Sequence, residues 1–428
     1  MGRKQIFRLC ILITAGLTGF GCAKSSDETA AASSGKNLYF ATGQCNSGTG
    51  ITTLSSTLSS RMIAKVNLSS KVQSVVFDLA AEYQGGFFAP ETGAQAIVDN
   101  GTSLLLLTEN AINMGDRKIF SVPKSNPFNT VIYASDSNAL TQTAAHITRS
   151  MVKEIDGSLL FSKSIAIEKI GSNVLRIPSG ANPYINAPGT NGANICNTSI
   201  TFMSNIAVLP PFTSTTNAGK IIFSHQGGTA GSNRLGIINK DGYTATTDCY
   251  AGKSVPSIVL ANDTGVSGLV SMDTTGPSPT SMVYIPDTVT PTQGKLIVGY
   301  SSSVAANLNN GTGFNYGIVM YDVTDATATT ATIQASGTGT VLYNTFSNVF
   351  GISAMTYDST NKHLYVATAS QQGVANQTTA AYGYKVEKFA LDLTATTVPK
   401  LTLIRDNNKP FMDRSSFTRC ITSMAIGD

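Results

Sequence analysis

The sequence predicts an all-β fold, a six-bladed β-propeller, with a ring of seven blades as the alternative. The first observation is composition: 42% of the 428 residues are apolar and 13% are charged, so small polar residues must cover the surface, as is typical of β-rich proteins. The second is a strand-like segment that recurs roughly every 65 residues, the length of a multi-stranded repeat. The third is that no strong amphipathic helix pattern follows the N-terminal segment.

The recurring segment is a short apolar strand, as in "SLLLLTE", "KLIVGYS" and "HLYVATA". A turn with Gly, Asn or Asp precedes each copy, a strand usually lies before that turn, and a third and often a fourth strand follow. The copies lie at Leu38, Leu104, Leu159, Ile221, Leu296 and Leu364. Three or four short strands per repeat indicate a propeller, whereas two β-sandwiches, the other arrangement considered, require no such period.

The two ends of the repeat region are expected to meet in one blade. Ile421–Met424 matches Ile352–Met355 at the first strand of the preceding repeat, and the sequence stops where the next strand is due. The segment at Leu38 supplies that strand, and residues 61–70 and 72–79 supply a third and a fourth. We therefore expect the C-terminal strand to pair with N-terminal strands and close the ring.

Four cysteines follow Cys22, which in an exported protein suggests two disulfides, with three pairings open. Ring closure would place Cys45, at the end of one strand, beside Cys420, at the start of its antiparallel neighbour. Cys196 and Cys249 would then pair within one repeat.

The segment "NKHLYVATASQQ" followed by "GYKVEKFALD", within residues 361–392, resembles a blade of the YVTN/NHL-like class of propeller. The resemblance covers one repeat well and the others loosely, so it implies a fold and not an activity. The chain contains no Trp, which argues against WD40 repeats and against the tryptophan-docked blades of quinoprotein-like propellers.

The N-terminus has the pattern of an export signal. Basic residues in "MGRKQIFR" precede the apolar run "LCILITAGLTGF", which is shorter than the ~20 residues of a membrane-spanning helix. The following "GCAKSS" resembles the lipobox of bacterial lipoproteins, which implies cleavage after residues 1–21 and a lipid on Cys22. Ala23 after that cysteine implies the outer membrane, on the periplasmic or surface side. Simple secretion and a retained anchor are the alternatives.

Residues 22–36 are polar and of low complexity, so we expect a flexible tether between the lipid and a propeller over residues 37–428. The chain carries 29 basic and 25 acidic residues, and three of the basic ones lie in the signal. This balance excludes a basic nucleic-acid-binding surface as the expected function.

No motif predicts catalysis, and we expect no catalytic residues, metal or cofactor. His146, His225 and His363 fall in different repeats without metal-ligand spacing. "DSTN", from Asp358 to Asn361, has the pattern of a β-turn and not of a calcium loop.

Ser–Met pairs recur on the strands expected to be innermost. Because side chains alternate along a strand, the small residue and the methionine should point to opposite faces, and the methionine should fill the wedge between blades. The alternative is that the set lines a ligand channel. The pairs are Ser150–Met151, Ser281–Met282 and Ser423–Met424, with Ala354–Met355 in a fourth copy.

Two loops carry aromatic residues beside glycines and are candidate contact surfaces. Tyr83, Phe87 and Phe88 lie in "AAEYQGGFFAPE", and Phe314 and Tyr316 lie in "GTGFNYG". The competing interpretation is that these rings pack between blades.

These features favour a lipid-anchored envelope module that binds or scaffolds a protein or glycan partner, rather than an enzyme. The alternative is a propeller-type hydrolase, lactonase-like or glycosidase-like, with a metal in the central funnel; a purely structural role is a third interpretation. Three or more clustered Asp, Glu or Asn side chains in the funnel would favour the enzyme. An apolar or Ser/Thr-lined funnel would favour binding.

Overall fold

In the computed structural model, the compact part of the chain runs over Gly35–Asp428. The described part contains no helix with the length and hydropathy that a membrane crossing requires. The residues that the structure describes are 35–43, 62–78, 92–110, 118–135, 146–153, 159–165, 173–177, 193–197, 203–209, 220–225, 234–239, 257–259, 278–289, 293–301, 317–323, 340–344, 351–371, 382–395, 400–414 and 420–428.

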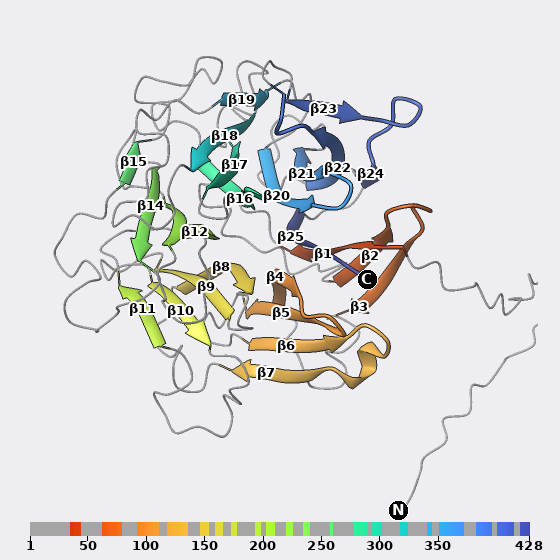
Figure 1. Cartoon of the computed structure of the whole chain (residues 1–428). Helices are drawn as coiled ribbons and strands as arrows, with labels where there is room; N and C mark the ends of the chain where they lie inside the picture. Colours follow the sequence, from red (N-terminus) through yellow and green to blue (C-terminus); the bar gives the residue numbers. More distant parts are fainter. Residues whose placement is uncertain are drawn as a thin grey trace, which may run out of the picture. The chain divides into compact units, whose positions relative to one another are not determined.

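The described strands form six antiparallel sheets, named here blades A to F (Figure 1). Blade A has the order β25 (Cys420–Gly427), β1 (Asn37–Gly43), β2 (Met62–Asn67) and β3 (Gln73–Asp78). Blade B contains β4 (Thr92–Asp99), β5 (Ser103–Asn110), β6 (Lys118–Pro123) and β7 (Val131–Ser135), with a short 3-10 turn, η1 (Pro127–Asn129), before β7. Blade C contains β8 (His146–Lys153), β9 (Leu159–Ile165), β10 (Asn173–Ile177) and β11 (Ala193–Asn197).

The second half of the ring repeats the pattern. Blade D contains β12 (Met203–Leu209), β13 (Lys220–His225), β14 (Arg234–Asn239) and β15 (Ser257–Val259). Blade E contains β16 (Ser278–Pro286), β17 (Gly294–Ser301), β18 (Gly317–Val323) and β19 (Thr340–Tyr343). Blade F contains β20 (Gly351–Asp358), β21 (His363–Gln371), β22 (Tyr382–Leu391) and β23 (Leu401–Ile404), and β24 (Met412–Arg414) also pairs with β22.

The first strand of each sheet is the innermost one, and these strands surround a common centre. Contacts join β25 to β4, β4 to β8, β8 to β12, β12 to β16, β16 to β20, and β20 back to β25. In Figure 1, β25 accordingly lies between β20 and β4. The fold is therefore an all-β propeller, and the seven-bladed alternative is wrong because the described strands form six sheets.

Blade A combines strands from opposite ends of the sequence. β25 pairs with β1 in antiparallel register, with Met424 opposite Phe40 and Cys420 opposite Gly43. Cys45, two residues beyond Gly43, lies outside the described residues, as does Cys249. No disulfide is found among the described residues, so the Cys45–Cys420 pairing stays a prediction.

The expected placement of two cysteines in one repeat is wrong. "NVLRIPS" supplies β10, the third strand of blade C. The fourth strand is β11, which contains Cys196. Cys249 follows β14 in blade D, so the two cysteines do not belong to one repeat as expected.

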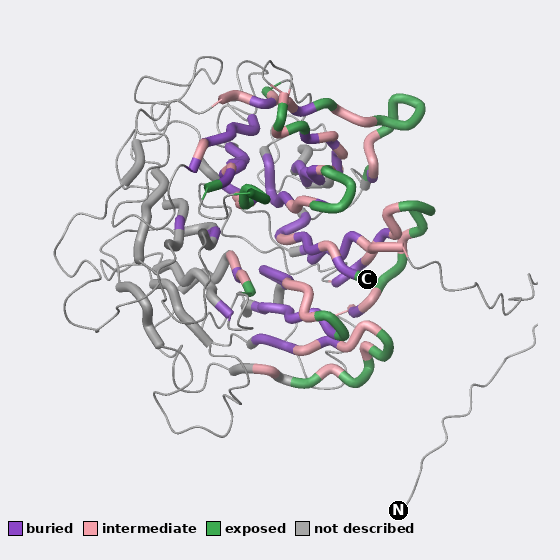
Figure 2. The backbone as a smooth tube through the Cα atoms, in the orientation of Figure 1, coloured by how far each residue is buried: buried purple, intermediate pink, exposed green. Residues whose placement is uncertain are grey.

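The hydrophobic core lies between the blades rather than inside any one of them. Strand β5 shows the arrangement because it buries both of its faces (Figure 2). Leu104 and Leu106 pack in a cluster with Tyr39 of blade A, whereas Leu105 and Leu107 pack in a cluster with blade C. A run of four leucines therefore suits a strand with a neighbour on each side, and each buried side chain contributes about 1.5–3 kcal/mol.

Every inner strand departs from regular pairing at one place. The register with the second strand shifts between Ala94 and Ala96 in blade B, and an equivalent shift occurs in the five other blades. These shifts are β-bulges, in which an extra residue stays unpaired and successive side chains can point to the same side. In blade A the extra residue is Thr422, and in blade E it is Thr280.

Hydroxyl groups at the bulges bridge neighbouring inner strands. Thr422 donates its Oγ1 hydrogen bond to the carbonyl oxygen of Ala94 in blade B at 2.9 Å, and Thr280 donates to the carbonyl of Ile352 in blade F at 2.5 Å. Ser423, which follows Thr422 in blade A, also bridges to blade B: its Oγ accepts a hydrogen bond from the backbone N–H of Ile97 at 3.1 Å. The inner edge of each blade would otherwise present unpaired backbone groups, so these hydroxyls satisfy part of that edge.

We predict that Thr422→Val destabilises the propeller by about 1–2 kcal/mol, because a buried carbonyl of the next blade loses its donor while side-chain volume is kept. Thr280→Val should act similarly. The measurement is the free energy of unfolding in urea. Thr402→Val, at an exposed position of β23, is the matched control and should change stability by less than about 0.5 kcal/mol. Equal stabilities for the buried and the exposed variants would contradict the bridging role.

Candidate functional site

A cavity of about 340 Å³ lies among the inner strands. Its lining residues come from all six blades, on β25, β4, β8, β12, β16 and β20. This volume is within the range of small-molecule sites in proteins. The cavity is therefore the candidate functional site.

The cavity wall includes a Met or Ile side chain at the equivalent position of each blade, together with further apolar residues such as Val98, Val152 and Ile426. The six equivalent residues are Ile97, Met151, Ile206, Met282, Met355 and Met424. Met355 belongs to a core cluster with blade E, and Met424 belongs to one with blade F. The methionines therefore fill the wedge between blades, as the alternation predicts, and also form part of the cavity wall.

Hydroxyl side chains form the uncharged polar part of the wall. They are Ser150, Ser281, Ser353, Thr356, Thr422 and Ser423. Some of them already bond to protein groups: Ser150 Oγ accepts from the backbone N–H of Ile206 at 3.4 Å, and Ser353 Oγ donates to the Ala367 carbonyl at 3.4 Å. Hydroxyls are thus distributed around the wall, while several of them also hold neighbouring strands together.

Asp99 and Lys153 are the charged residues of the described lining. Asp99 Oδ1 lies 2.8 Å from Lys124 Nζ, which also donates to the backbone oxygen of Asp428 at 3.1 Å. Tyr39 OH donates to the same oxygen at 2.9 Å, and burial together with Asp99 raises the pKa of this phenol. The carboxylate of Asp99 is therefore held by a cation at the junction of blades A and B.

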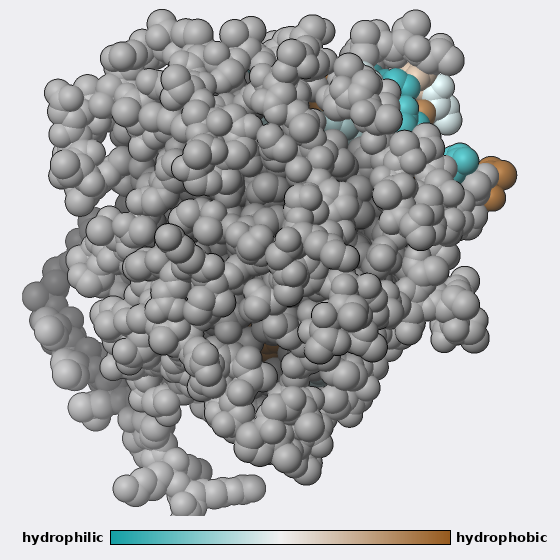
Figure 3. Space-filling model, turned by 90° about the vertical axis from the view of Figure 1, so that its left-hand side faces the viewer, coloured by the Kyte–Doolittle hydropathy of each residue, from teal (hydrophilic) through white to brown (hydrophobic). Residues whose placement is uncertain are grey.

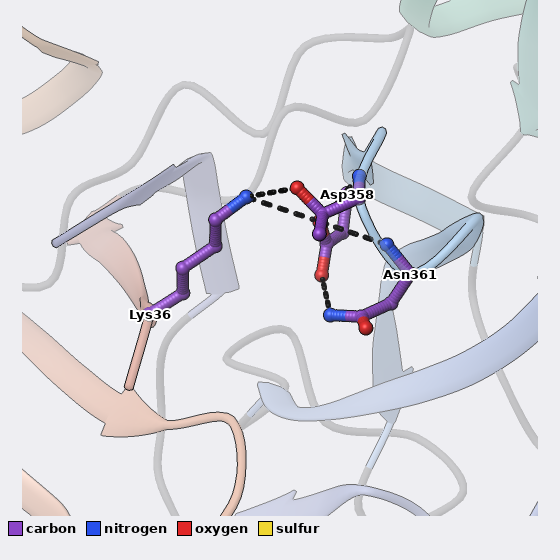
Figure 4. Close-up of polar contacts among 4 residues, drawn as sticks. Lys36, Asp358 and Asn361 are labelled. Carbon is purple, nitrogen blue, oxygen red and sulfur yellow. Dashed lines mark hydrogen bonds and ion pairs between the residues drawn. The ribbon is translucent and has the colours of Figure 1, made fainter. Parts of the chain in front are cut away.

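A second polar cluster joins blade A to blade F, and Figure 4 shows its geometry. Asp358, at the end of β20, has a fully buried side chain whose Oδ1 lies 3.5 Å from Lys36 Nζ. Asn361 donates its side-chain N–H to Asp358 Oδ2 at 2.6 Å, and the backbone N–H of Thr360 donates to Oδ1 at 3.0 Å. The "DSTN" segment is therefore a turn closed by its own aspartate, and Lys36 ties it to the neighbouring blade.

These contacts set the protonation of the cluster. Burial would by itself raise the pKa of Asp358, but the hydrogen bonds from Asn361 and Thr360 and the charge of Lys36 bring it below its ordinary value. Burial and Asp358 raise the pKa of Tyr365 to about 12. The aspartate is thus ionised and the phenol protonated at neutral pH.

The structure describes only some of the residues that the sequence singled out. Tyr83, Phe87, Phe88, Phe314, Tyr316 and Cys22 lie outside the described residues. His146 begins β8, His225 ends β13 and His363 begins β21, each in a different blade. Within the described residues, no group of three or more His, Cys, Asp or Glu side chains could hold a metal ion.

Sequence reasoning did not identify Lys36 as the partner of the buried Asp358, or Lys124 as the partner of the half-buried Asp99. Lys36 and Thr360 of the Asp358 turn are 324 positions apart, so no local pattern connects them. Large apolar side chains are scattered among the described surface residues and do not reveal a further site: Val72, Val75, Phe128, Val131 and Val289. On the face drawn in Figure 3, described hydrophilic residues gather near a small hydrophobic area at one edge.

No family model matches the chain, and no curated protein matches its sequence. Solved structures of similar fold include a thermostable family-43 glycoside hydrolase, at 8% identity and a TM-score of 0.45, over 76% of this chain and 96% of that one. They also include an α-L-arabinofuranosidase from Lactobacillus brevis, at 10% identity and a TM-score of 0.41, over 71% and 94%. A third is AofleA from Arthrobotrys oligospora, at 11% identity and a TM-score of 0.43, over 86% and 83%. At these identities the likeness concerns the fold and carries no activity over to this chain.

We predict that Asp358→Ala destabilises the protein by about 1–3 kcal/mol, because the N–H groups of Thr360 and Asn361 lose the buried acceptor that closes this turn. Asp358→Asn, the matched variant, keeps an acceptor for them and should lose less. Because the pKa of Asp358 is lowered by folding, its ionic contribution is complete above the unfolded value of about 3.9 and disappears as pH falls through the folded value.

The measurement is the urea midpoint of the wild-type chain and of Asp358→Asn between neutral and acidic pH. The wild-type advantage should be constant near neutrality and shrink in acid. An advantage that is independent of pH would show that the Lys36–Asp358 pair contributes nothing.

Proposed function

We propose that this chain is a β-propeller binding module, and that its central cavity receives an uncharged, largely apolar part of a protein or glycan partner. The lining of the cavity carries the proposal. One Met or Ile side chain from each blade supplies apolar surface, and Ser and Thr hydroxyls supply groups that can accept or donate hydrogen bonds. An apolar wall with a few polar groups is typical of ligand sites that orient a neutral molecule.

A glycoside hydrolase is the second candidate function, because glycoside hydrolases are among the solved structures of similar fold. Hydrolysis of a glycosidic bond commonly needs two carboxyl groups on opposite sides of the bond. Asp99 is the one described lining residue with a carboxylate group, and that group forms an ion pair with Lys124. The lining therefore supports the binding module better, and an activity assay separates the two functions.

We predict that the full chain binds octyl β-glucoside, used below its critical micelle concentration, because this probe joins an apolar chain to sugar hydroxyls. Met282→Lys should abolish binding, since the ammonium group enters the apolar part of the wall, whereas Met282→Leu should retain it. Met282 is half-buried, so the lysine can extend toward water and the chain should still fold.

Isothermal titration measures this binding, and circular dichroism checks the fold of each variant. Unchanged binding by Met282→Lys would overturn the proposed site. Release of reducing sugar from arabinan by the wild-type chain would replace the binding module with the hydrolase.

We also propose that the module is a lipoprotein of the bacterial outer membrane, anchored through Cys22 with residues 22–36 as a tether. We predict that Cys22→Ser moves the protein from the membrane fraction to the soluble fraction and lowers its mass by the attached lipid, because one modified cysteine carries the anchor. Fractionation and intact mass measure both changes. A soluble wild-type chain would indicate simple secretion, and a chain that keeps residues 1–21 would indicate a retained anchor.

A further inference from the structure

Blade F presents two polar side chains toward blade A, at the junction where Lys36 meets Asp358. Lys388 of β22 lies directly opposite Tyr365 of β21, so both side chains project from the same face of the sheet. Tyr365 belongs to a core cluster with Leu38 and Val66 of blade A, which identifies that face as the one turned toward blade A. The ring centres of His363 and Tyr365 are 6.4 Å apart.

Two ion pairs connect the blades around this position. Lys36 pairs with Asp358, and Lys71 of blade A pairs with Asp406 of blade F. These two cations each have a carboxylate, whereas no ion pair joins Lys388 to any described residue. Lys388 is therefore an ammonium group without a paired carboxylate among the described residues, and it is only half exposed.

Neighbouring charges act on both Lys388 and His363. Burial and the charge of Lys71 lower the pKa of Lys388, against the opposing effect of Asp358. Burial and the charge of Lys388 likewise lower the pKa of His363, again against Asp358. In both cases the neighbouring cation outweighs the buried carboxylate, so an added anion would be attracted there.

We propose that the junction of blades A and F is a binding site for an oxyanion, a phosphate or carboxylate group, held by Lys388 and His363 with Lys71 at its edge. An ammonium group and an imidazolium group can both donate charge-assisted hydrogen bonds to such an anion. The site is separate from the central cavity, so this inference does not depend on the proposed function. The anion can come from a small soluble molecule or from a lipid headgroup, and the test distinguishes these sources.

Inorganic phosphate is the probe, with the full wild-type chain. Phosphate should raise the thermal midpoint and should raise the pKa of His363, which NMR of the imidazole signals follows and which His363→Gln assigns. Lys388→Met should weaken phosphate binding by about tenfold or more, as expected for the loss of a charged partner. This variant should fold, because it removes a half-buried charge that has no partner among the described residues.

Lys362→Asn is the matched control. It removes the same charge from the exposed turn beside His363, and Asn tolerates the positive φ of 57° at that position. It should keep the phosphate effect on both readouts. A general salt effect on stability would appear equally in every variant. Equal phosphate effects in the wild-type chain and in Lys388→Met would therefore overturn the proposal.

Vesicles identify the source of the anion. The vesicle test uses the Cys22→Ser chain, which lacks the proposed anchor. If this chain sediments with phosphatidylglycerol vesicles but not with phosphatidylcholine vesicles, and Lys388→Met abolishes the effect, the site is supported with a lipid headgroup as the anion. Phosphate binding without vesicle binding would support it with a soluble anion.

Discussion

The propeller depends on the way one inner strand satisfies the exposed edge of the next. An innermost strand pairs on one side only, and its other edge faces the centre of the ring. In blades A and E the bulge of the inner strand places a threonine at the junction with the following blade. Thr422 and Ser423 use their hydroxyls to bond the backbone of β4, and Thr280 does the same for β20. Apolar packing between blades supplies most of the burial, and these hydrogen bonds fix how each blade is oriented on its neighbour.

The same arrangement determines the chemical character of the cavity. Several hydroxyls on its wall hold neighbouring strands together, which restricts how they can meet a ligand. Met282, Met355 and Met424 have two roles as well, because they pack between blades and also line the cavity. Recognition at the centre and cohesion of the ring therefore use the same side chains. Asp358 and Lys36, by contrast, connect blades A and F and do not belong to the cavity lining.

The propeller could be predicted because its strands leave a strong local pattern. The unbroken apolar run from Leu104 to Leu107 is what a strand with a neighbour on each side requires. The bulges could not be predicted, because a bulge exists only relative to a partner strand. The placement of Cys196 was wrong because connections of unequal length hide the boundary between blades C and D. Of the candidate site, the Ser–Met pairs and the turn at Asp358 were visible in sequence. The partner of that aspartate, Lys36, was not, because the contact spans nearly the whole ring.

Blade A also has a consequence for the time course of folding. Ala41 and Thr422, which hydrogen-bond across β1 and β25, are 381 positions apart. At the ordinary rate of synthesis of about 5–20 residues per second, β1 to β3 would wait on the order of tens of seconds for their inner strand. During that interval the edge of β1 is a template for pairing with another chain. A chain that folds from its N-terminus thus carries an open end until its last strand arrives, and this makes aggregation before closure the main hazard of the architecture.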